Sequence, residues 1–229
     1  MISLRRICRQ FNQSMSLIFG QTFEQRAQGR GERQAAPTLE GIRSDHIARY
    51  QFACRFIPDR AKILDLACGI GYGSQILATQ TNCQAVQAID KSRTAIKYAK
   101  QFYGTNKIAF QVADGLKMPL PNQYFDVVTS FETIEHVPDA SILLNQFFTT
   151  LKPGGLLICS TPNQNELPYN QQEYPFHFRH YTPSELQTLT SQLGFQLMHV
   201  YAQPSRETSE IIEGWNGLFN ILILTKLSP

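Results

Sequence analysis

The chain has 229 residues, of which 42% are hydrophobic and 17% charged, and its formal net charge is +3. This length suits one domain with a modest extension, and the hydrophobic content excludes collagen-like and wholly disordered classes. The small net charge gives no argument for nucleic acid or membrane binding, and no apolar run approaches the roughly 20 residues that span a bilayer. The five scattered cysteines include no C-x-x-C pair, which favours a reducing compartment and a cytoplasmic protein over a disulfide framework.

The N-terminal segment has a different composition from the rest. Residues 1–36 are rich in Gln, Arg and Gly, and we interpret 1–43 as an N-terminal extension of a domain over 44–229. Arg5, Arg6 and Arg9 all precede the first acidic residue, Glu24, as in an organelle transit peptide. We favour a solvated basic lead-in, and the sequence leaves both interpretations open.

From residue 44 onward, predicted helices and strands alternate. A helix over 44–56, capped by Ser44 or Asp45, is followed by a strand at 62–67, a brief helix from residue 74 and a strand at 84–90. A helix over 92–103, strands at 107–114 and 125–131, a helix at 139–151 and a strand at 155–161 come next. The chain ends with a helix from Thr182 to Gly194 and with strands at 195–202 and 217–227.

This alternation predicts the fold class. We expect an α/β fold with a doubly wound, mostly parallel seven-stranded sheet of Rossmann-like type and right-handed crossovers. The last two strands have no helix between them and predict an antiparallel hairpin at the C-terminal edge. Ligands bind beyond the carboxyl ends of the strands in such a sheet, so the residues that follow each strand are the candidates for a site.

The first two strands end in residues suited to a nucleotide-like ligand. The first runs into ILDLACGIGYGS (63–74), where Asp65 precedes a turn through the small residues Ala67, Gly69 and Gly71, which let the backbone approach a ligand closely. Asp90 ends the second strand, where a carboxylate accepts hydrogen bonds from ribose hydroxyls in dinucleotide-binding folds. The alternative for Asp90 is a helix N-cap.

The third and fourth strands also end in polar residues. Asp114-Gly115 suits either the exocyclic amine of a purine ring or an ordinary Asp-Gly turn. SFETIEHVPDA (130–140) places Glu132, Glu135 and His136 just past the fourth strand. An imidazole is a general base near neutral pH, so His136, with Glu132 beside it, is the favoured catalytic residue. The alternative is that Glu135 and His136 only cap or pair with local backbone.

Together these motifs resemble the class I S-adenosylmethionine-dependent methyltransferases. LDLACGIGYG is similar to the family's first motif, with alanine where a first glycine is usual, and FDVV (125–128) and LKPGGLLICSTPN (151–163) follow in the family's order. The resemblance implies S-adenosylmethionine as the cofactor and roles for matching residues: Asp65, Ala67, Gly69 and Gly71 line its methionine part, Asp90 holds the ribose, Asp114 and Gly115 face the adenine, and Phe131 and Glu132 border the sulfonium. Arg49 is a candidate partner of the cofactor's carboxylate, with a plain surface arginine as the alternative.

Other segments narrow the resemblance. GERQAAP (31–37), SDHIARYQFA (44–53) and NQQEYPFHFRHYTPSEL (170–186) are similar to bacterial methyltransferases of glycan and polysaccharide biosynthesis. ETIEHVPD (132–139) also resembles ubiquinone-biosynthesis O-methyltransferases and small-RNA 2′-O-methyltransferases, where a Glu-x-x-Glu-His set binds a divalent metal. That resemblance implies a metal site formed by Glu132, Glu135, His136 and either His177 or His180.

The predicted function is therefore methyl transfer to a hydroxyl of a small molecule or glycan. Basic and aromatic residues in the loop 163–181 suit an anionic acceptor such as a sugar nucleotide, whereas nucleic acid is disfavoured by the weak net charge. One alternative is a metal-assisted O-methyltransferase acting on a quinone, a catechol or an RNA 2′-hydroxyl. Another is a non-catalytic cofactor-binding module, because a fold alone does not secure activity. The sequence carries no signal for the oligomeric state.

Overall fold

The structure is a computed structural model that describes residues 23–28 and 33–227. The basic residues Arg5, Arg6 and Arg9, and with them the two interpretations of the N-terminal segment, lie outside the described residues. Within 23–28 and 33–227, no helix is both long and apolar enough to cross a bilayer.

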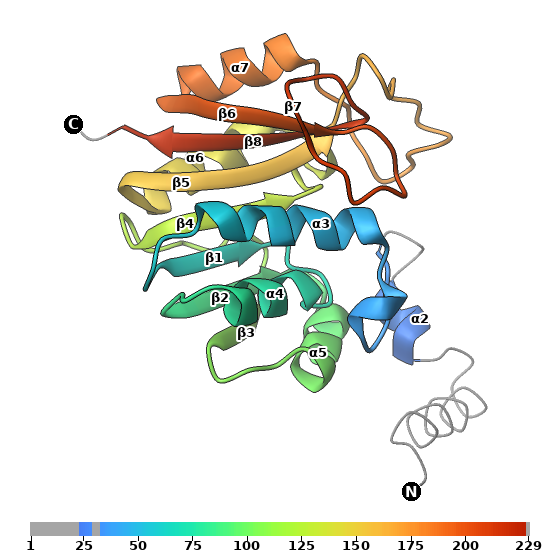
Figure 1. The fold of residues 1–229 in the computed structure, drawn as a ribbon, viewed down its shortest axis with the longest axis vertical. Coiled ribbons are helices and arrows are strands. Elements are labelled where there is room, and N and C mark those ends of the chain that lie inside the picture. Colours follow the sequence, from blue (N-terminus) through green and yellow to red (C-terminus); the bar gives the residue numbers. More distant parts are fainter. Residues whose placement is uncertain (1–22, 29–32, 228–229) are drawn as a thin grey trace, which may run out of the picture.

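An eight-stranded sheet in the order β3-β2-β1-β4-β5-β8-β6-β7 forms the centre of the molecule (Figure 1). The parallel strands are β1 (Lys62–Leu66), β2 (Ala85–Asp90), β3 (Ile108–Val112), β4 (Phe125–Phe131) and β5 (Leu151–Pro162). β8 (Phe219–Lys226) lies between β5 and β6 (Phe195–Gln203) and is antiparallel to both. This confirms the predicted fold class and the antiparallel C-terminal pair.

The strand count differs from the prediction by one. The extra strand, β7 (Ile212–Glu213), contributes two residues that pair with β6 at the edge of the sheet. Two residues cannot show the alternation by which a strand is predicted, so β7 had no sequence signal.

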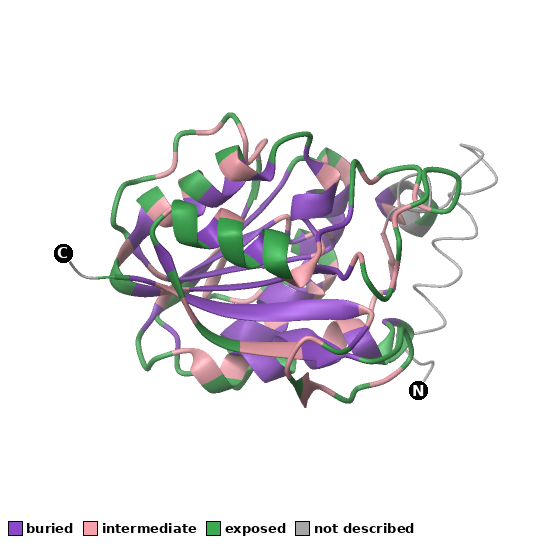
Figure 2. Ribbon diagram, turned by 90° about the horizontal axis from the view of Figure 1, so that it is seen from above, coloured by how far each residue is buried: buried purple, intermediate pink, exposed green. Residues whose placement is uncertain are grey.

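Helices cover both faces of the sheet (Figures 1 and 2). One face carries α3 (Ser44–Ala53), α4 (Tyr72–Gln80) and α5 (Arg93–Phe102), and α2 (Phe23–Gln28) packs on α5. The other face carries α6 (Ala140–Thr150) and α7 (Pro183–Gln192). The described residues also form the short 3-10 helices η1 (Leu39–Gly41), η2 (Cys54–Phe56) and η3 (Ile134–His136).

The core explains why the central strands are apolar throughout. Neighbouring residues of a strand point to opposite faces, and both faces are covered by helices here. Ile63 and Leu64 of β1 are both completely buried, but they belong to the two different apolar clusters on either side of the sheet.

The structure confirms two of the predicted helix N-caps and contradicts a third. Ser92 caps α5, and Thr182 and Glu185 form the predicted capping box at the start of α7. The predicted cap of α3 is wrong, because no side chain caps this helix. Asp45 is instead completely buried, where it pairs with two arginines. The Ser44 hydroxyl donates to the carbonyl oxygen of Glu207.

Candidate functional site

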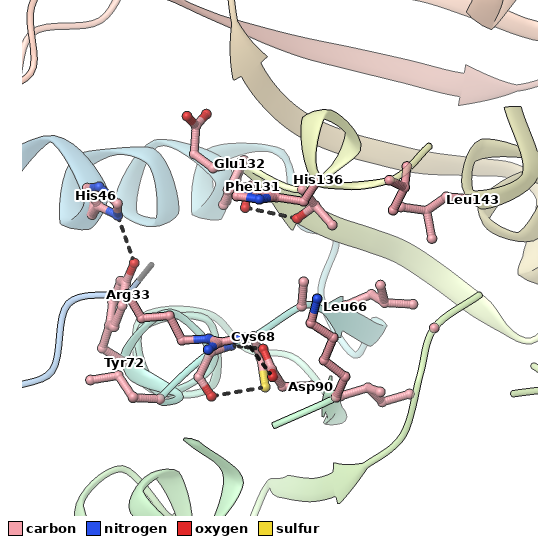
Figure 3. A pocket seen from close by; sticks show the side chains of 18 of the residues that line it. Arg33, His46, Leu66, Cys68, Tyr72, Asp90, Phe131, Glu132, His136 and Leu143 are labelled. Atoms are coloured by element: carbon pink, nitrogen blue, oxygen red, sulfur yellow. Dashed lines mark hydrogen bonds and ion pairs between the residues drawn. The ribbon is translucent and has the colours of Figure 1, made fainter. Parts of the chain in front are cut away.

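A cavity of about 400 Å³ lies at the carboxyl ends of β1, β2 and β4. This volume is within the range of small-molecule sites. Figure 3 shows Arg33 and Asp90 on one side of the cavity and Glu132 and His136 on the other. The sequence predicted many of the lining residues, namely Arg49, Ala67, Gly69, Asp90, Asp114, Gly115, Phe131, Glu132 and His136.

Two residues predicted to line the cofactor lie behind the cavity wall. Asp65 is completely buried and accepts hydrogen bonds from the hydroxyls of Tyr50, Ser74 and Thr129 at 3.2, 2.5 and 3.0 Å. Burial raises the pKa of Asp65 to about 6. Gly71 is the N-cap of α4, where a Cβ atom would lie 2.7 Å from the ring of Phe110. Asp65 and Gly71 therefore do not line the cavity, but their contacts hold the segments that form its wall in place.

The turn after β1 holds an unusual backbone. Gly69 and Gly71 have φ values of +56° and +88°, and Ala67, which stands where the family usually has glycine, has φ of +64°. A side chain in this left-handed region costs about 1–2 kcal/mol. Backbone strain of this kind is often found at ligand sites, where the surrounding structure maintains it.

Asp90 combines a local role with access to the cavity. One carboxylate oxygen accepts from the backbone N–H of Gly69 at 2.9 Å and the other from that of Ser92 at 2.7 Å. Ser92, and not Asp90, is the N-cap of α5. Asp90 is 4% exposed, and the guanidinium of Arg33 lies 3.5 Å from one of its oxygens.

Asp114 and Gly115 form a turn at the rim. The Asp114 carboxylate accepts from the backbone N–H of Leu116 at 3.0 Å, as expected for an ordinary Asp-Gly turn. Asp114 and Gly115 nevertheless also line the cavity. A Cβ atom on Gly115 would lie 2.8 Å from the side chain of Leu66, so a larger residue there would force Leu66 to shift.

Arg49 lies inside the protein, which excludes the surface-arginine alternative. It is 1% exposed, and its Nε donates to the amide oxygen of Gln203 at 2.5 Å. Its other nitrogens lie 3.3 Å from Asp45 and 3.6 Å from Glu132. The guanidinium also lies 4.6 Å above the ring centre of Phe219. This charge is therefore held at the cavity wall by four partners from different parts of the chain.

Glu132 is held by β5 as well as by Arg49. Its backbone, with φ of +50°, donates to the carbonyl of Ser160 at 3.0 Å, and its carboxylate accepts from the Ser160 hydroxyl at 2.7 Å. The Glu132 side chain is 19% exposed. Its carboxylate is thus fixed at the cavity wall rather than mobile.

His136 presents one ring nitrogen as an acceptor when neutral. Its Nδ1 lies 3.0 Å from the carbonyl oxygen of Phe176. A carbonyl only accepts, so Nδ1 carries the hydrogen and Nε2 keeps a lone pair. Nε2 lies 3.9 Å from the nearer carboxylate oxygen of Glu135.

Glu135 is fully buried beside this imidazole. One carboxylate oxygen accepts from Thr161 at 2.9 Å, and the other has no hydrogen-bond partner among the described residues. Burial, with the nearby charge of Glu132, raises the pKa of Glu135 well above its usual value. A buried polar atom without a partner is costly, so this oxygen marks a place where a ligand atom would be stabilising.

Two further histidines form a chain behind His136. His180 Nδ1 lies 2.6 Å from the carbonyl oxygen of Leu167, so it carries a hydrogen, and His180 Nε2 lies 2.8 Å from His177 Nδ1. Burial lowers the pKa of both His177, to about 3, and His180. In the neutral chain, His180 Nε2 accepts from His177 Nδ1, and His177 Nε2 keeps its lone pair.

The structure brings together part of the predicted metal set. Ligand atoms of Glu135, His136 and His177 all lie within 4.8 Å of one another, and no metal ion is part of the structure. Glu132 is outside this group and contacts Arg49 and Ser160 instead. The Glu-x-x-Glu-His spacing therefore places only its second glutamate beside the histidines.

Several residues of the cavity wall come from segments that precede β1 and were not predicted from the sequence. Arg33, Gln34, Arg43, His46 and Tyr50 line the cavity, and burial lowers the pKa of His46 to about 3. All of these except Arg43 belong to GERQAAP (31–37) and SDHIARYQFA (44–53), whose resemblance to the glycan-associated enzymes was the available signal. The loop 163–181 contacts η3 but contributes no residue to the cavity wall among those described.

Known proteins are similar to this chain. Residues 38–200 match a family model described as a methyltransferase domain. A probable S-adenosylmethionine-dependent methyltransferase of Mycobacterium tuberculosis is 33% identical over 141 residues, which cover 58% of this chain and 48% of that protein. The 2-methyl-6-phytyl-1,4-hydroquinone methyltransferase of Synechocystis is 33% identical over 123 residues, covering 52% of this chain and 38% of that protein.

The fold is similar to solved structures as well. A chain in the complex of the Haloferax volcanii Trm112 methyltransferase activator with a putative methyltransferase has a TM-score of 0.72 at 17% identity, over 90% of this chain and 98% of that one. The chain spans about half the length of the curated relatives it matches. The family model covers most of this chain, so the chain belongs to the methyltransferase-domain family, and its resemblance to class I S-adenosylmethionine-dependent methyltransferases is confirmed.

Proposed function

We propose that the chain transfers the methyl group of S-adenosylmethionine to a hydroxyl of a small molecule or glycan. The observation that carries this proposal is that Asp90, Asp114 and Gly69 line the same cavity as Glu132 and His136. A carboxylate suited to the ribose of the cofactor and an imidazole suited to deprotonate the acceptor therefore face the same cavity. The hydroquinone substrate in the name of the Synechocystis relative also favours a small hydroxylated acceptor.

The cavity fits the cofactor chemically. Each carboxylate oxygen of Asp90 accepts one backbone N–H, which leaves a lone pair on each for the ribose hydroxyls. Ile89, Leu116, Val137 and Leu143 offer an apolar surface for the adenine ring. When bound, S-adenosylmethionine supplies an activated methyl group on a positively charged sulfur.

The chain's own residues then position the acceptor and remove its proton. His136 Nε2 accepts the proton of the acceptor hydroxyl, because Phe176 holds the hydrogen on Nδ1. Glu132 and Arg49 form the wall beside this base, and their mutual contact keeps both side chains in place. Most of the rate enhancement in such a displacement comes from holding the two reactants in line.

Calorimetry and a methyl-transfer assay test the two halves separately. Asp90→Ala should abolish binding of S-adenosylmethionine, and unchanged affinity would remove Asp90 from the site. His136→Ala should leave cofactor binding nearly intact and slow transfer by roughly 10²–10⁴. The acceptor screen covers sugar nucleotides, catechols and quinone precursors, and S-adenosylhomocysteine formation is measured in each case. Binding without any product in this screen or in cell extract would favour a non-catalytic module.

A metal-assisted reaction is the second candidate, favoured by the unpartnered oxygen of Glu135. Glu135, His136 and His177 would hold the ion, and a bound cation lowers the pKa of a hydroxyl. Two imidazoles with one carboxylate suit zinc, iron or manganese better than magnesium. The carbonyl of Phe176 and the ring of His180 orient the two imidazoles from behind, as second partners of metal ligands do.

Metal binding is measured directly with Mn²⁺ and Zn²⁺ by calorimetry. His177→Ala should abolish binding, whereas Glu132→Gln, the matched control, should retain it because Glu132 lies outside the group. Full methyl-transfer activity in a chelator would eliminate this candidate. The division at residues 43 and 44, the cytoplasmic location and an anionic acceptor stay predictions.

A further inference from the structure

The segment 33–43 crosses one side of the cavity, and its first five residues precede the region that matches the family model. It is fixed in place by specific contacts. The Tyr103 hydroxyl donates to the carbonyl of Ala36 at 2.5 Å, and the backbone N–H of Arg43 donates to the side chain of Gln34 at 2.8 Å. A Cβ atom on Gly41 would lie 2.4 Å from that of Ala36, so the segment folds tightly on itself.

Arg33, at the start of this segment, reaches the carboxylate of Asp90. Its guanidinium lies 3.5 Å from Asp90 Oδ1, and the two side chains are 17% and 4% exposed. The stem of Arg33 passes over the turn after β1, where a Cβ atom on Gly69 would lie 3.9 Å from Arg33 Cδ. Figure 3 shows the two side chains together at the cavity wall.

The geometry leaves Asp90 able to bind a diol. The 3.5 Å separation is longer than the 2.7–2.9 Å typical of a direct charge-assisted hydrogen bond. Gly69 and Ser92 use one acceptor position on each oxygen, so further positions remain. A hydroxyl that donates to Asp90 still has lone pairs that accept hydrogen bonds, and the N–H groups of a guanidinium can donate to them.

We propose that Arg33 is a cofactor-binding residue that donates to the ribose hydroxyl oxygens while Asp90 accepts their hydrogens. This role rests on the proposed function, because it assigns the ribose of S-adenosylmethionine to Asp90. It extends the site into a segment before the family domain, so the N-terminal extension takes part in cofactor recognition.

The experiment compares binding of S-adenosylmethionine and S-adenosylhomocysteine by calorimetry. Both ligands carry the same ribose, but only the first carries a positive sulfur. Arg33→Ala should weaken both by the same factor, about tenfold or more, since a hydrogen bond to a charged group is lost. Arg33→Lys should restore part of the affinity, because an ammonium donates but lacks the planar fork. Arg93→Ala is the matched control, since Arg93 is exposed at the start of α5 and does not line the cavity.

The outcomes separate the two proposals. Unchanged binding by Arg33→Ala would mean that Arg33 does not contribute to ligand binding, and tighter binding would mean that it competes with the ligand for Asp90. Either result would overturn the inference while leaving the proposed function intact. A loss for only one of the two ligands would also overturn it, because the shared ribose could not be the cause. If the wild-type chain binds neither ligand, the proposed function fails and the role of Arg33 fails with it. Thermal unfolding of each variant checks that the fold is retained.

Discussion

Replacing Asp65 by asparagine tests how the floor of the cavity is stabilised. Asp65 is completely buried, and three hydroxyls donate to it. Burial is the largest influence on this carboxyl and raises its pKa from 3.8 to about 6, against the opposing effect of the hydrogen bonds. The asparagine side chain would keep the shape and an acceptor oxygen but would carry no charge, and the hydroxyls can rotate to meet its amide.

The sign of the pH dependence follows from the raised pKa. The folded state binds the Asp65 proton more tightly than the unfolded state, so the free energy of unfolding falls as the pH rises through this range. Each pKa unit corresponds to about 1.4 kcal/mol, so the rise to about 6 costs the folded protein about 3 kcal/mol at neutral pH. Asp65→Asn removes this dependence. Relative to the wild type, the variant should gain about 2–3 kcal/mol between pH 4 and pH 7.

Urea denaturation at a series of pH values measures this difference, and the other titrating groups largely cancel between the two proteins. Asp126 offers a matched control with the opposite sign. It accepts from the backbone N–H of Lys62 and from Lys152, and these contacts lower its pKa. Asp126→Asn should therefore lose stability relative to the wild type as the pH rises. A pH-independent difference for Asp65→Asn would refute the argument from burial.

Three further substitutions test local packing and backbone geometry by thermal and urea unfolding. Gly73→Ala should destabilise the protein by about 1–3 kcal/mol, because the new Cβ would lie 2.0 Å from the ring of Tyr50; a neutral result would mean that α3 moves freely. Ala67→Gly relieves the positive φ, but glycine also gives the unfolded chain more conformational freedom, so the net stabilisation should be about 0.5–1 kcal/mol. A loss of stability would contradict the inference that the backbone of Ala67 is strained. Thr182→Ala should cost about 1 kcal/mol by removing the cap of α7, and Gln187→Ala, at an exposed position of the same helix outside the cap, serves as the comparison.

The part of the site that follows the strands was predictable from the sequence. Asp90, Asp114 and Glu132 each come at or just after the end of a parallel strand, and such ends meet at one edge of a sheet. Their order along the chain therefore indicated a shared cavity without any knowledge of side-chain contacts. The structure places all three in its wall.

The contribution of α3 and the segment before it was not predictable in the same way. Arg49 is buried because Gln203, which is 154 positions away, accepts from its Nε, and because Asp45 lies one helical turn before it. A helix pattern shows neither partner. The same pairing draws Asp45 into the protein and leaves α3 without the side-chain cap that its sequence indicated. The positive φ of Glu132, likewise, sends this side chain toward Arg49, and spacing alone could not distinguish that from a place beside Glu135.

His136 connects the two candidate reactions and cannot serve both in the same state. Phe176 holds the hydrogen on Nδ1, so Nε2 provides the lone pair in either case. A lone pair shared with a cation is no longer available to take a proton from a hydroxyl. If His136 is the base, His136→Ala slows transfer and a chelator does not. If it is a metal ligand, His136→Ala and His177→Ala both abolish binding of Mn²⁺, and the chelator slows the wild type as much as either substitution does. Measuring Mn²⁺ binding and methyl transfer with and without the chelator therefore assigns Nε2 to one role. A wild-type chain that loses activity in the chelator but binds no metal would contradict both candidate roles.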